Sequence, residues 1–448
     1  MTANTDRDSA TSDITASPFA PLEPSFVAAN LGNLRDPALN LDSVYGDGPA
    51  FNSAAPTQAA DFYDGIKLRV GTVAEVSNVP GRSIQGEKIP PEADLERDLP
   101  RDAAGKAQIG DGRNDENLII AQLHTAFLRF HNAVVDWVTD NESVYGGPEA
   151  IFARARQLTR WHYQWLVVHD YLKTVTMTGT ADKVLLAEDE DHLYQPHEGT
   201  AYMPLEYSVA VYRFGHSMIR AVYDYNRNFG RPGTGAPSAS FFLLFAFTGK
   251  FSPPFFGATN VLPFNWVIEW DRMVDKGARE PDHFARKIDT NLAPPMRDLT
   301  NEGNDATPPI RTILKRLATR NLLRGYLLGI PTGQKVAEAM SIEPLSGDEL
   351  KLDNHPAVDD ALEAGGFLES TPLWYYVLKE AEVRANGNSL GPVGSRIVCE
   401  TIIGQIRQDA GSYLNHPGGW DPGEGVRLPD GQAIVSIADL LRFAGVLV

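Results

Sequence analysis

VYRFGHSMIR, at residues 211–220, is the stretch on which the interpretation of this chain depends. The run 206–221 around it contains no proline and a single glycine, which favours a helix. Tyr212, His216 and Ile219 follow one another at spacings of four and three, so they share one helix face and predict an internal histidine. A buried imidazole needs a partner, which is either a hydrogen-bonding group or a metal. On this residue alone, a satisfied core histidine is the commoner outcome.

A second stretch, IGDGRNDENLIIAQLHTAFLRFHNAVVDWV at residues 109–138, shows a glycine-marked turn that leads into a long helix. Asn114 or Asp115 can cap this helix. Arg113 and Glu116 stand three apart at its start, so their side chains can reach a common point. The alternative is a capping cluster with one exposed ion pair, which contributes little. Its helical stripe consists of Leu123, Phe127, Phe130 and Val134.

Together these motifs resemble a known family. An arginine, two residues, a glutamate and a helix carrying HTAFLRFHN, with YRFGH further along the chain, is similar to the animal haem peroxidase superfamily and particularly to its compact bacterial members. The resemblance covers nearly the whole chain. It implies a single helical haem-binding domain at residues 61–448, preceded by an N-terminal arm at residues 1–60.

The resemblance assigns His216 as the ligand of the haem iron. In the family, an asparagine accepts a hydrogen bond from this histidine and an arginine three residues later meets a haem propionate, positions that fall on Asn321 and Arg324. An amide oxygen fixes the imidazole tautomer with less electron donation than a carboxylate gives. We also expect Arg213 to be a cofactor-binding residue. It occupies the position of the radical tyrosine of the prostaglandin synthases, so that branch is set aside.

The opposite face of the haem is predicted to be altered. Bacterial relatives carry a segment GQF-x-DHDIT-x-x-P-x-x-PLE whose histidine lies over the haem, and this chain reads TSDITASPFAPLEP at residues 11–24. Aligned on DIT and PLE, the histidine position falls on Ser12 and the preceding aspartate position on Thr11. Ser12 thus takes the catalytic position but cannot act as a base at neutral pH.

Two residues of the second stretch complete this face by resemblance. Arg113 would polarise a bound peroxide or hold an anionic substrate. Glu116 matches the glutamate that forms an ester with a haem methyl in some family members, whereas Thr11 cannot supply a second ester. The expected cofactor is therefore haem b or a singly ester-linked haem.

A calcium site is also implied by the resemblance. The loop NLRDPALNLDSVYGDGP, at residues 33–49, carries oxygen ligands at alternate positions, which suit Ca²⁺. An Asx-rich turn without an ion is the alternative. The implied ligands are Asp13, Asp36, the Ala38 carbonyl, Asn40 and Asp42.

Composition sets further bounds on the whole chain. With 448 residues, 43% hydrophobic and 22% charged, it is typical of a soluble globular protein, and the scarcity of alternating strand patterns favours a mainly α fold. A net charge of −18 argues against binding nucleic acid or anionic membranes by bulk electrostatics. No apolar run is long enough for a membrane span, and the first residues show no secretory signal. The single cysteine, Cys399, lies in an apolar run that reads as buried helix, and it favours a reducing, cytoplasmic location.

The sequence thus predicts a haem-dependent oxidoreductase that uses peroxide or oxygen on a small organic substrate, with weak peroxidase activity because Ser12 cannot transfer the proton of peroxide. A non-redox haem enzyme such as a dehydratase or isomerase, or a haem-binding sensor, is the second interpretation. A helical scaffold that binds no haem is the third. The substrate and the oligomeric state are not predicted.

Overall fold

The computed structural model describes residues 19–30, 36–51, 59–74, 93–196, 201–230, 238–250, 261–275, 285–299 and 302–447. The chain forms two compact units, each assembled from three separate segments. Unit 1 consists of Met1–Leu39, Val167–Ala221 and Ala285–Asn415, and unit 2 consists of Asn40–Leu166, Val222–Phe284 and His416–Val448. The expected division into an arm at residues 1–60 and a domain at residues 61–448 stays a prediction.

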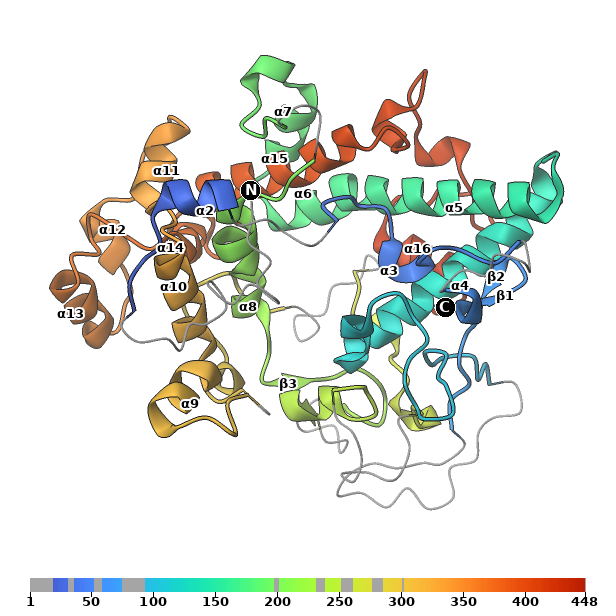
Figure 1. Cartoon of the computed structure of the whole chain (residues 1–448), viewed down its shortest axis with the longest axis horizontal. Coiled ribbons are helices and arrows are strands. Elements are labelled where there is room, and N and C mark those ends of the chain that lie inside the picture. Colours follow the sequence, from blue (N-terminus) through green and yellow to red (C-terminus); the bar gives the residue numbers. More distant parts are fainter. Residues whose placement is uncertain are drawn as a thin grey trace. The chain divides into compact units, whose positions relative to one another are not determined.

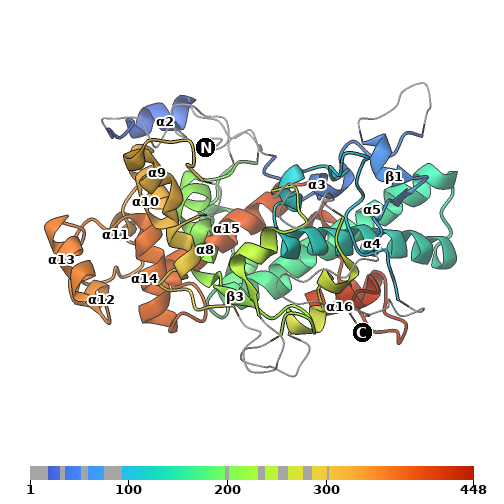
Figure 2. The same cartoon turned by 90° about the horizontal axis from the view of Figure 1, so that it is seen from below.

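Unit 2 is built around two long helices, α4 (Leu118–Asn141) and α5 (Gly147–Leu166), which pack side by side (Figures 1 and 2). Phe130 and Val134 of the predicted stripe are completely buried, and the other two members are half-buried. A cluster of apolar side chains that includes Tyr45 packs beside these helices. The expected long amphipathic helix after the glycine-marked turn is therefore present.

The cap of α4 differs from the prediction. Asn117 is the N-cap, because its side-chain oxygen accepts a hydrogen bond from the backbone N–H of Ile120 at 3.0 Å. Asn114 and Asp115 lie before it in a separate 3-10 turn, η2 (Gly112–Asp115). The chain thus makes one more turn than the sequence predicts before the long helix begins.

The remaining described elements of unit 2 are short. Two antiparallel pairs, β1 with β2 and β3 with β4, are in register through Tyr63↔Leu68 and Val222↔Ser240. The elements are α3 (Asp42–Tyr45), η1 (Ala60–Phe62), β1 (Tyr63–Asp64), β2 (Lys67–Leu68), β3 (Val222–Tyr223), β4 (Ala239–Ser240), η8 (Phe241–Phe245), η9 (Phe264–Trp266), η10 (Trp270–Arg272), η14 (Pro422–Glu424) and α16 (Ile437–Phe443).

Unit 1 is centred on α14 (Leu373–Ala385) and α15 (Pro392–Gln408), which pack against each other. Pro392 occupies the first turn of α15, where no intrahelical N–H is needed. The carboxylate of Glu380 on α14 accepts hydrogen bonds from the backbone N–H groups of Val393 at 3.0 Å and Gly394 at 3.2 Å. These bonds satisfy donors at the start of α15 that the helix itself cannot satisfy.

Around this pair lie the other described elements of unit 1. They are α2 (Pro24–Asn30), the π-helix η3 (Val167–Tyr171), α6 (Leu172–Val175), α7 (Thr180–Leu186), η4 (Asp189–Asp191), the π-helix η6 (Glu206–Ala210), η7 (Val211–Phe214), α8 (Gly215–Met218), η12 (Pro294–Arg297), α9 (Pro308–Lys315), α10 (Leu317–Leu327), α11 (Gly333–Ala339), α12 (Gly347–Lys351), α13 (Pro356–Ala364) and η13 (Tyr413–Asn415). Helix α10 lies beside α14 in both views (Figures 1 and 2).

The predicted mainly α fold is confirmed, since helices predominate and the strands of the described residues are only two residues long. Among these residues no helix is long and apolar enough to cross a membrane. Cys399 is buried within α15, as its apolar surroundings in the sequence predict.

Candidate functional site

His216 lies in a segment of unit 1 that changes helix type twice. The chain passes from the π-helix η6 to the 3-10 helix η7 and then to the single α-turn α8. Tyr212 is 41% exposed while His216 is half-buried, so the shared face expected from a regular helix does not form. The spacing argument was wrong here because it assumes 3.6 residues per turn throughout.

Helix α10 presents two buried polar side chains, Asn321 and Arg324. The amide Nδ2 of Asn321 lies 2.9 Å from Nδ1 of His216. The two residues that the sequence paired across more than a hundred positions are therefore in contact. The indole Nε1 of Trp374 donates to the backbone carbonyl of Arg213 at 3.2 Å, which ties η7 to α14.

The orientation of the Asn321 amide is the reverse of the expected one. Arg213 donates from Nη1 to the amide oxygen of Asn321 at 3.5 Å, and from Nε to the carbonyl of Ser208 at 3.1 Å. Because a guanidinium can only donate, the oxygen faces Arg213 and the amide nitrogen faces His216. Nδ1 of His216 then accepts, and the neutral imidazole carries its proton on Nε2.

Positive charge surrounds this imidazole. Burial lowers the pKa of His216 to about 4, with further lowering by Arg213 and Arg320, so the ring is neutral at neutral pH. Burial also lowers the pKa of Arg213 to about 10, and Arg324 and Arg320 add to the effect. Among the described residues no carboxylate lies within ion-pair distance of Arg213. Two guanidinium groups, those of Arg213 and Arg320, therefore lie near a neutral nitrogen base, and Arg324 lies near Arg213.

Arg320 was missed at the level of sequence. It interacts electrostatically with His216 and pairs with Glu302 at 3.3 Å. A signal was present, because Arg316, Arg320 and Arg324 follow one another at intervals of four and so line one side of a helix.

Arg113 and Glu116 lie in unit 2, at the turn before α4. Arg113 pairs with Asp111 rather than with Glu116: its Nη2 lies 2.5 Å from Oδ2 of Asp111, and the guanidinium is about half-exposed. This hydrogen bond raises the pKa of Arg113, and burial acts in the opposite direction. The nearby charge of Glu116 raises this pKa by a smaller amount. The Glu116 carboxylate is exposed and has no hydrogen bond to another described residue.

A buried histidine that the sequence did not assign lies behind this turn. Nδ1 of His124 on α4 is 2.9 Å from the amide nitrogen of Asn114, and burial lowers the pKa of His124 to about 4. The hydrogen bond ties the turn to the buried face of the helix.

The side-chain oxygens of two implied calcium ligands, Asp36 and Asn40, accept hydrogen bonds from nearby backbone N–H groups. Asp36 Oδ1 accepts from the backbone N–H of Ala38 at 3.1 Å in unit 1, and in unit 2 Asn40 Oδ1 accepts from the N–H of Asp42 at 3.0 Å. These are the contacts of the alternative Asx-rich turn. No group of three or more His, Cys, Asp or Glu side chains in the described part of the chain could hold a metal ion. Asp13, like Ser12, lies outside the described residues.

The comparisons with known proteins point to the same family as the sequence. Residues 65–246 match the family model for the animal haem peroxidases. The matched part of the chain is thus similar to that family. Over 123 residues it is 28% identical to a peroxidase-like protein of Margaritifera margaritifera, a match that covers 26% of this chain and 15% of that protein.

Two solved structures share the animal haem peroxidase fold with it. Peroxidase A from Dictyostelium discoideum superposes with a TM-score of 0.55 at 15% identity, over 92% of this chain and 70% of that one. A fatty acid alpha-dioxygenase from Oryza sativa, solved with palmitic acid, gives a TM-score of 0.50 at 13% identity, over 92% of this chain and 62% of that one. At these identities the likeness shows the fold.

The unit 1 site fits the haem of an animal haem peroxidase. The imidazole of His216 is neutral, as an iron ligand must be, and its Nε2 has no hydrogen-bond partner among the described residues. The buried guanidinium groups of Arg213 and Arg324 suit the carboxylates that a haem carries.

Proposed function

We propose that the chain is a haem-dependent oxidoreductase that uses peroxide or oxygen on a small organic substrate, with weak generic peroxidase turnover. The contact between His216 and Asn321, in a cluster with Arg213, Arg320 and Arg324, is the observation that carries the proposal. A bound haem would supply the redox chemistry. The match of residues 65–246 to the animal haem peroxidase family model supports an oxidoreductase of this kind.

The unit 1 residues would hold the haem and determine which ring nitrogen of His216 carries the proton. Binding a metal through Nε2 requires that the proton now on Nε2 move to Nδ1. The Asn321 amide would then turn its oxygen toward the imidazole, in the orientation that the sequence predicts. Arg213 would give up a weak 3.5 Å hydrogen bond and keep its bond to the Ser208 carbonyl.

Two features support weak peroxide turnover. The alignment of the N-terminal segment puts Ser12 where a base would take the first proton of hydrogen peroxide, a role that contributes a factor of about 10² to 10⁴ in rate. Asp111 binds Arg113 through both carboxylate oxygens, so the positive charge available to polarise a peroxide is partly offset.

The visible spectrum of protein expressed with ample haem tests the proposal. We expect a Soret band that is lost in His216→Ala and kept in the control His355→Ala, which changes an exposed histidine of the same unit. A wild-type protein without a Soret band would leave the third interpretation, a helical scaffold that binds no haem.

Peroxidase activity of the wild type and of Ser12→His, measured with hydrogen peroxide, distinguishes an impaired general peroxidase from a specialised enzyme. We expect little oxidation of a generic phenolic reductant by the wild type. A large gain in the variant would show an impaired general peroxidase, and a loss of substrate conversion would show a specialised enzyme whose distal space holds a particular substrate. Conversion of a substrate without any oxidant would favour the alternative, a non-redox dehydratase or isomerase or a haem-binding sensor.

The proposal also includes a haem ester, a calcium site and a cytoplasmic location. The exposed carboxylate of Glu116 is available for a single ester, which acid extraction of haem from wild type and Glu116→Gln distinguishes from unlinked haem b. Calcium retention is tested by metal analysis of Asp42→Asn after dialysis. The resemblance to bacterial members and the cytoplasmic location, which the buried free thiol of Cys399 supports, stay predictions.

A further inference from the structure

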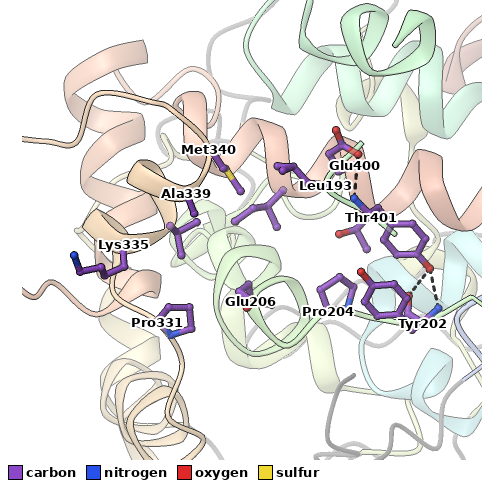
Figure 3. A pocket seen from close by; sticks show the side chains of 13 residues that line it. Leu193, Tyr202, Pro204, Glu206, Pro331, Lys335, Ala339, Met340, Glu400 and Thr401 are labelled. Carbon is purple, nitrogen blue, oxygen red and sulfur yellow. Dashed lines mark hydrogen bonds between the residues drawn. The ribbon is translucent and has the colours of Figure 1, made fainter. Parts of the chain in front are cut away.

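A pocket in unit 1 is lined by none of the residues described around His216. It has a volume of about 360 Å³ and is bordered by η6, α11, α15 and the residues Leu193, Tyr194, Tyr202 and Pro204 (Figure 3). This volume falls in the range of about 300 to 1,000 Å³ that is usual for small-molecule sites. Its apolar lining includes Val336, Met340 and Ile397, so an apolar body is accommodated.

One wall of the pocket is a rigid aromatic pair. The rings of Tyr194 and Tyr202 stack with centroids 4.5 Å apart and planes 7° from parallel. The hydroxyl of Tyr194 donates to the Tyr202 carbonyl at 2.7 Å and accepts from the Tyr202 N–H at 2.8 Å. Because these bonds hold the pair in place, little side-chain entropy would be lost when a ligand packs against it.

Most charged groups at the pocket are already paired. Glu400 is buried and binds Arg396 at 2.6 Å and His192 at 3.1 Å. Lys335 contributes its aliphatic stem, while its ammonium group binds Glu338 at 2.8 Å and points away from the pocket (Figure 3). No positive charge is therefore left to receive an anion.

Glu206 is different. This carboxylate, at the first residue of η6, forms no side-chain hydrogen bond or ion pair with any other described residue. Burial raises the pKa of the Tyr202 hydroxyl, with smaller contributions from Glu206 and Glu400 in the same direction. Both carboxylates thus lie close enough to Tyr202 to act on its hydroxyl, and since Glu400 is paired, Glu206 carries the uncompensated charge among the described residues that line the pocket.

We propose that this pocket binds a small organic ammonium ion, whose apolar body lies against Tyr202 and Met340 and whose ammonium group binds Glu206. The carboxylate supplies a charge-assisted hydrogen bond, and the tyrosine face attracts the cation. A neutral ligand would leave Glu206 unpaired, and an anion would be repelled by it. The site is independent of the proposed haem function.

Isothermal titration of the full-length protein with tryptamine tests this proposal. We expect saturable 1:1 binding that Glu206→Gln weakens by about tenfold or more, the scale of one hydrogen bond to a charged group. Glu369→Gln removes an exposed carboxylate of the same unit and should leave the affinity unchanged. Indole-3-acetate, which has the same ring and a negative charge, should not bind.

A second variant keeps the test informative if Glu206→Gln folds poorly. Ala339→Phe places a ring at the exposed rim of the pocket on α11 and should abolish tryptamine binding while circular dichroism shows an unchanged helix content. Absence of tryptamine binding to the wild type would overturn the proposal. So would equal affinity in Glu206→Gln, or binding of indole-3-acetate as tight as that of tryptamine.

Discussion

At His216, one neighbouring amide determines which ring nitrogen carries the proton. Asn321 is 1% exposed and lies between the imidazole and the Arg213 guanidinium, so neither of its polar atoms can turn to water. Any change at position 321 therefore acts directly on the imidazole. The neutral amide also limits the electron density that the ring can give to a bound iron.

We predict that Asn321→Asp lowers the reduction potential of the haem-loaded protein. A carboxylate accepting the Nδ1 proton makes the imidazole a stronger donor, which favours ferric over ferrous iron. If this change favours the ferric over the ferrous form by about 10 to 100-fold, the scale of such supporting residues, the one-electron potential falls by about 60 to 120 mV. Potentiometric titration of the Soret band measures the shift, with exposed Asn304→Asp as control. A potential equal to that of the wild type would contradict it.

A second residue-scale prediction concerns Glu380. Burial raises its pKa to about 7, although two backbone N–H groups oppose the shift. Because the folded pKa lies above the unfolded value, its contribution to stability is full below pH 4.5 and is lost as pH rises through about 7. We expect the stability of Glu380→Gln relative to wild type to rise by about 3 kcal/mol between pH 4 and pH 8. Urea unfolding at both values measures it, and an unchanged difference would show that Glu380 does not titrate in this range.

For single residues, the sequence predicted which side chains meet better than it predicted how they are oriented. It paired His216 with Asn321, and the two are in contact. It did not predict the reversed amide, because that orientation depends on Arg213 donating to the oxygen. It also joined Arg113 to Glu116, whereas the nearer carboxylate of Asp111 binds the guanidinium. Spacing along a chain does not reveal such competition between partners.

Among the elements, regular helices were predicted well and irregular ones were not. Hydrophobic periodicity located α4, but it missed the irregular helix around His216. Residues 308–334 are similarly divided into α9, a break at Arg316, α10 and then a turn into α11. An average period cannot register one extended residue or a change to π or 3-10 turns. Around His216 those changes accompany tertiary hydrogen bonds, such as that from Trp374.

An element-scale prediction concerns the start of α4. Asn117→Ala removes the side-chain oxygen that accepts the Ile120 N–H, and we expect unfolding free energy to fall by about 1 kcal/mol. Asn117→Asp keeps an acceptor and should restore most of the loss. Urea denaturation of the three proteins at neutral pH decides the matter. Equal stability of the alanine variant would mean that water replaces the cap without cost.

For the molecule as a whole, composition predicted the mainly α class but not the two units. Each unit collects three segments, with boundaries near residues 39, 166, 221, 284 and 415. No linker-like stretch marks the boundary at 166, which falls where α5 passes into the π-helix η3. Units of this kind are defined by contacts between distant segments, which one sequence does not display.

The described part of unit 2 contains three buried histidines, His124, His131 and His162, whose charge state links its stability to pH. Burial is the main cause that lowers their pKa values, to about 4, 4 and 3 respectively. In an unfolded chain the pKa of histidine is about 6.5. The folded values are depressed, so the stabilisation is present above pH 6.5 and is lost as pH falls toward 4. At pH 5 each of these histidines therefore lowers the free energy of unfolding by about 2 kcal/mol relative to its value above pH 6.5.

We therefore predict a steep loss of unit 2 stability between pH 7 and pH 5. Hydrogen exchange of peptides from α4 and α5, corrected for the intrinsic rate, measures it within this unit. His162→Gln removes one titrating group and should reduce the loss by about a third, whatever its effect at pH 7. His416→Gln changes a half-buried histidine of the same unit, whose ring lies against Trp161, and should leave the slope as it is. If His162→Gln and wild type share one slope, protonation of the buried ring is not what weakens the unit, and the acid sensitivity must arise from its carboxylates instead.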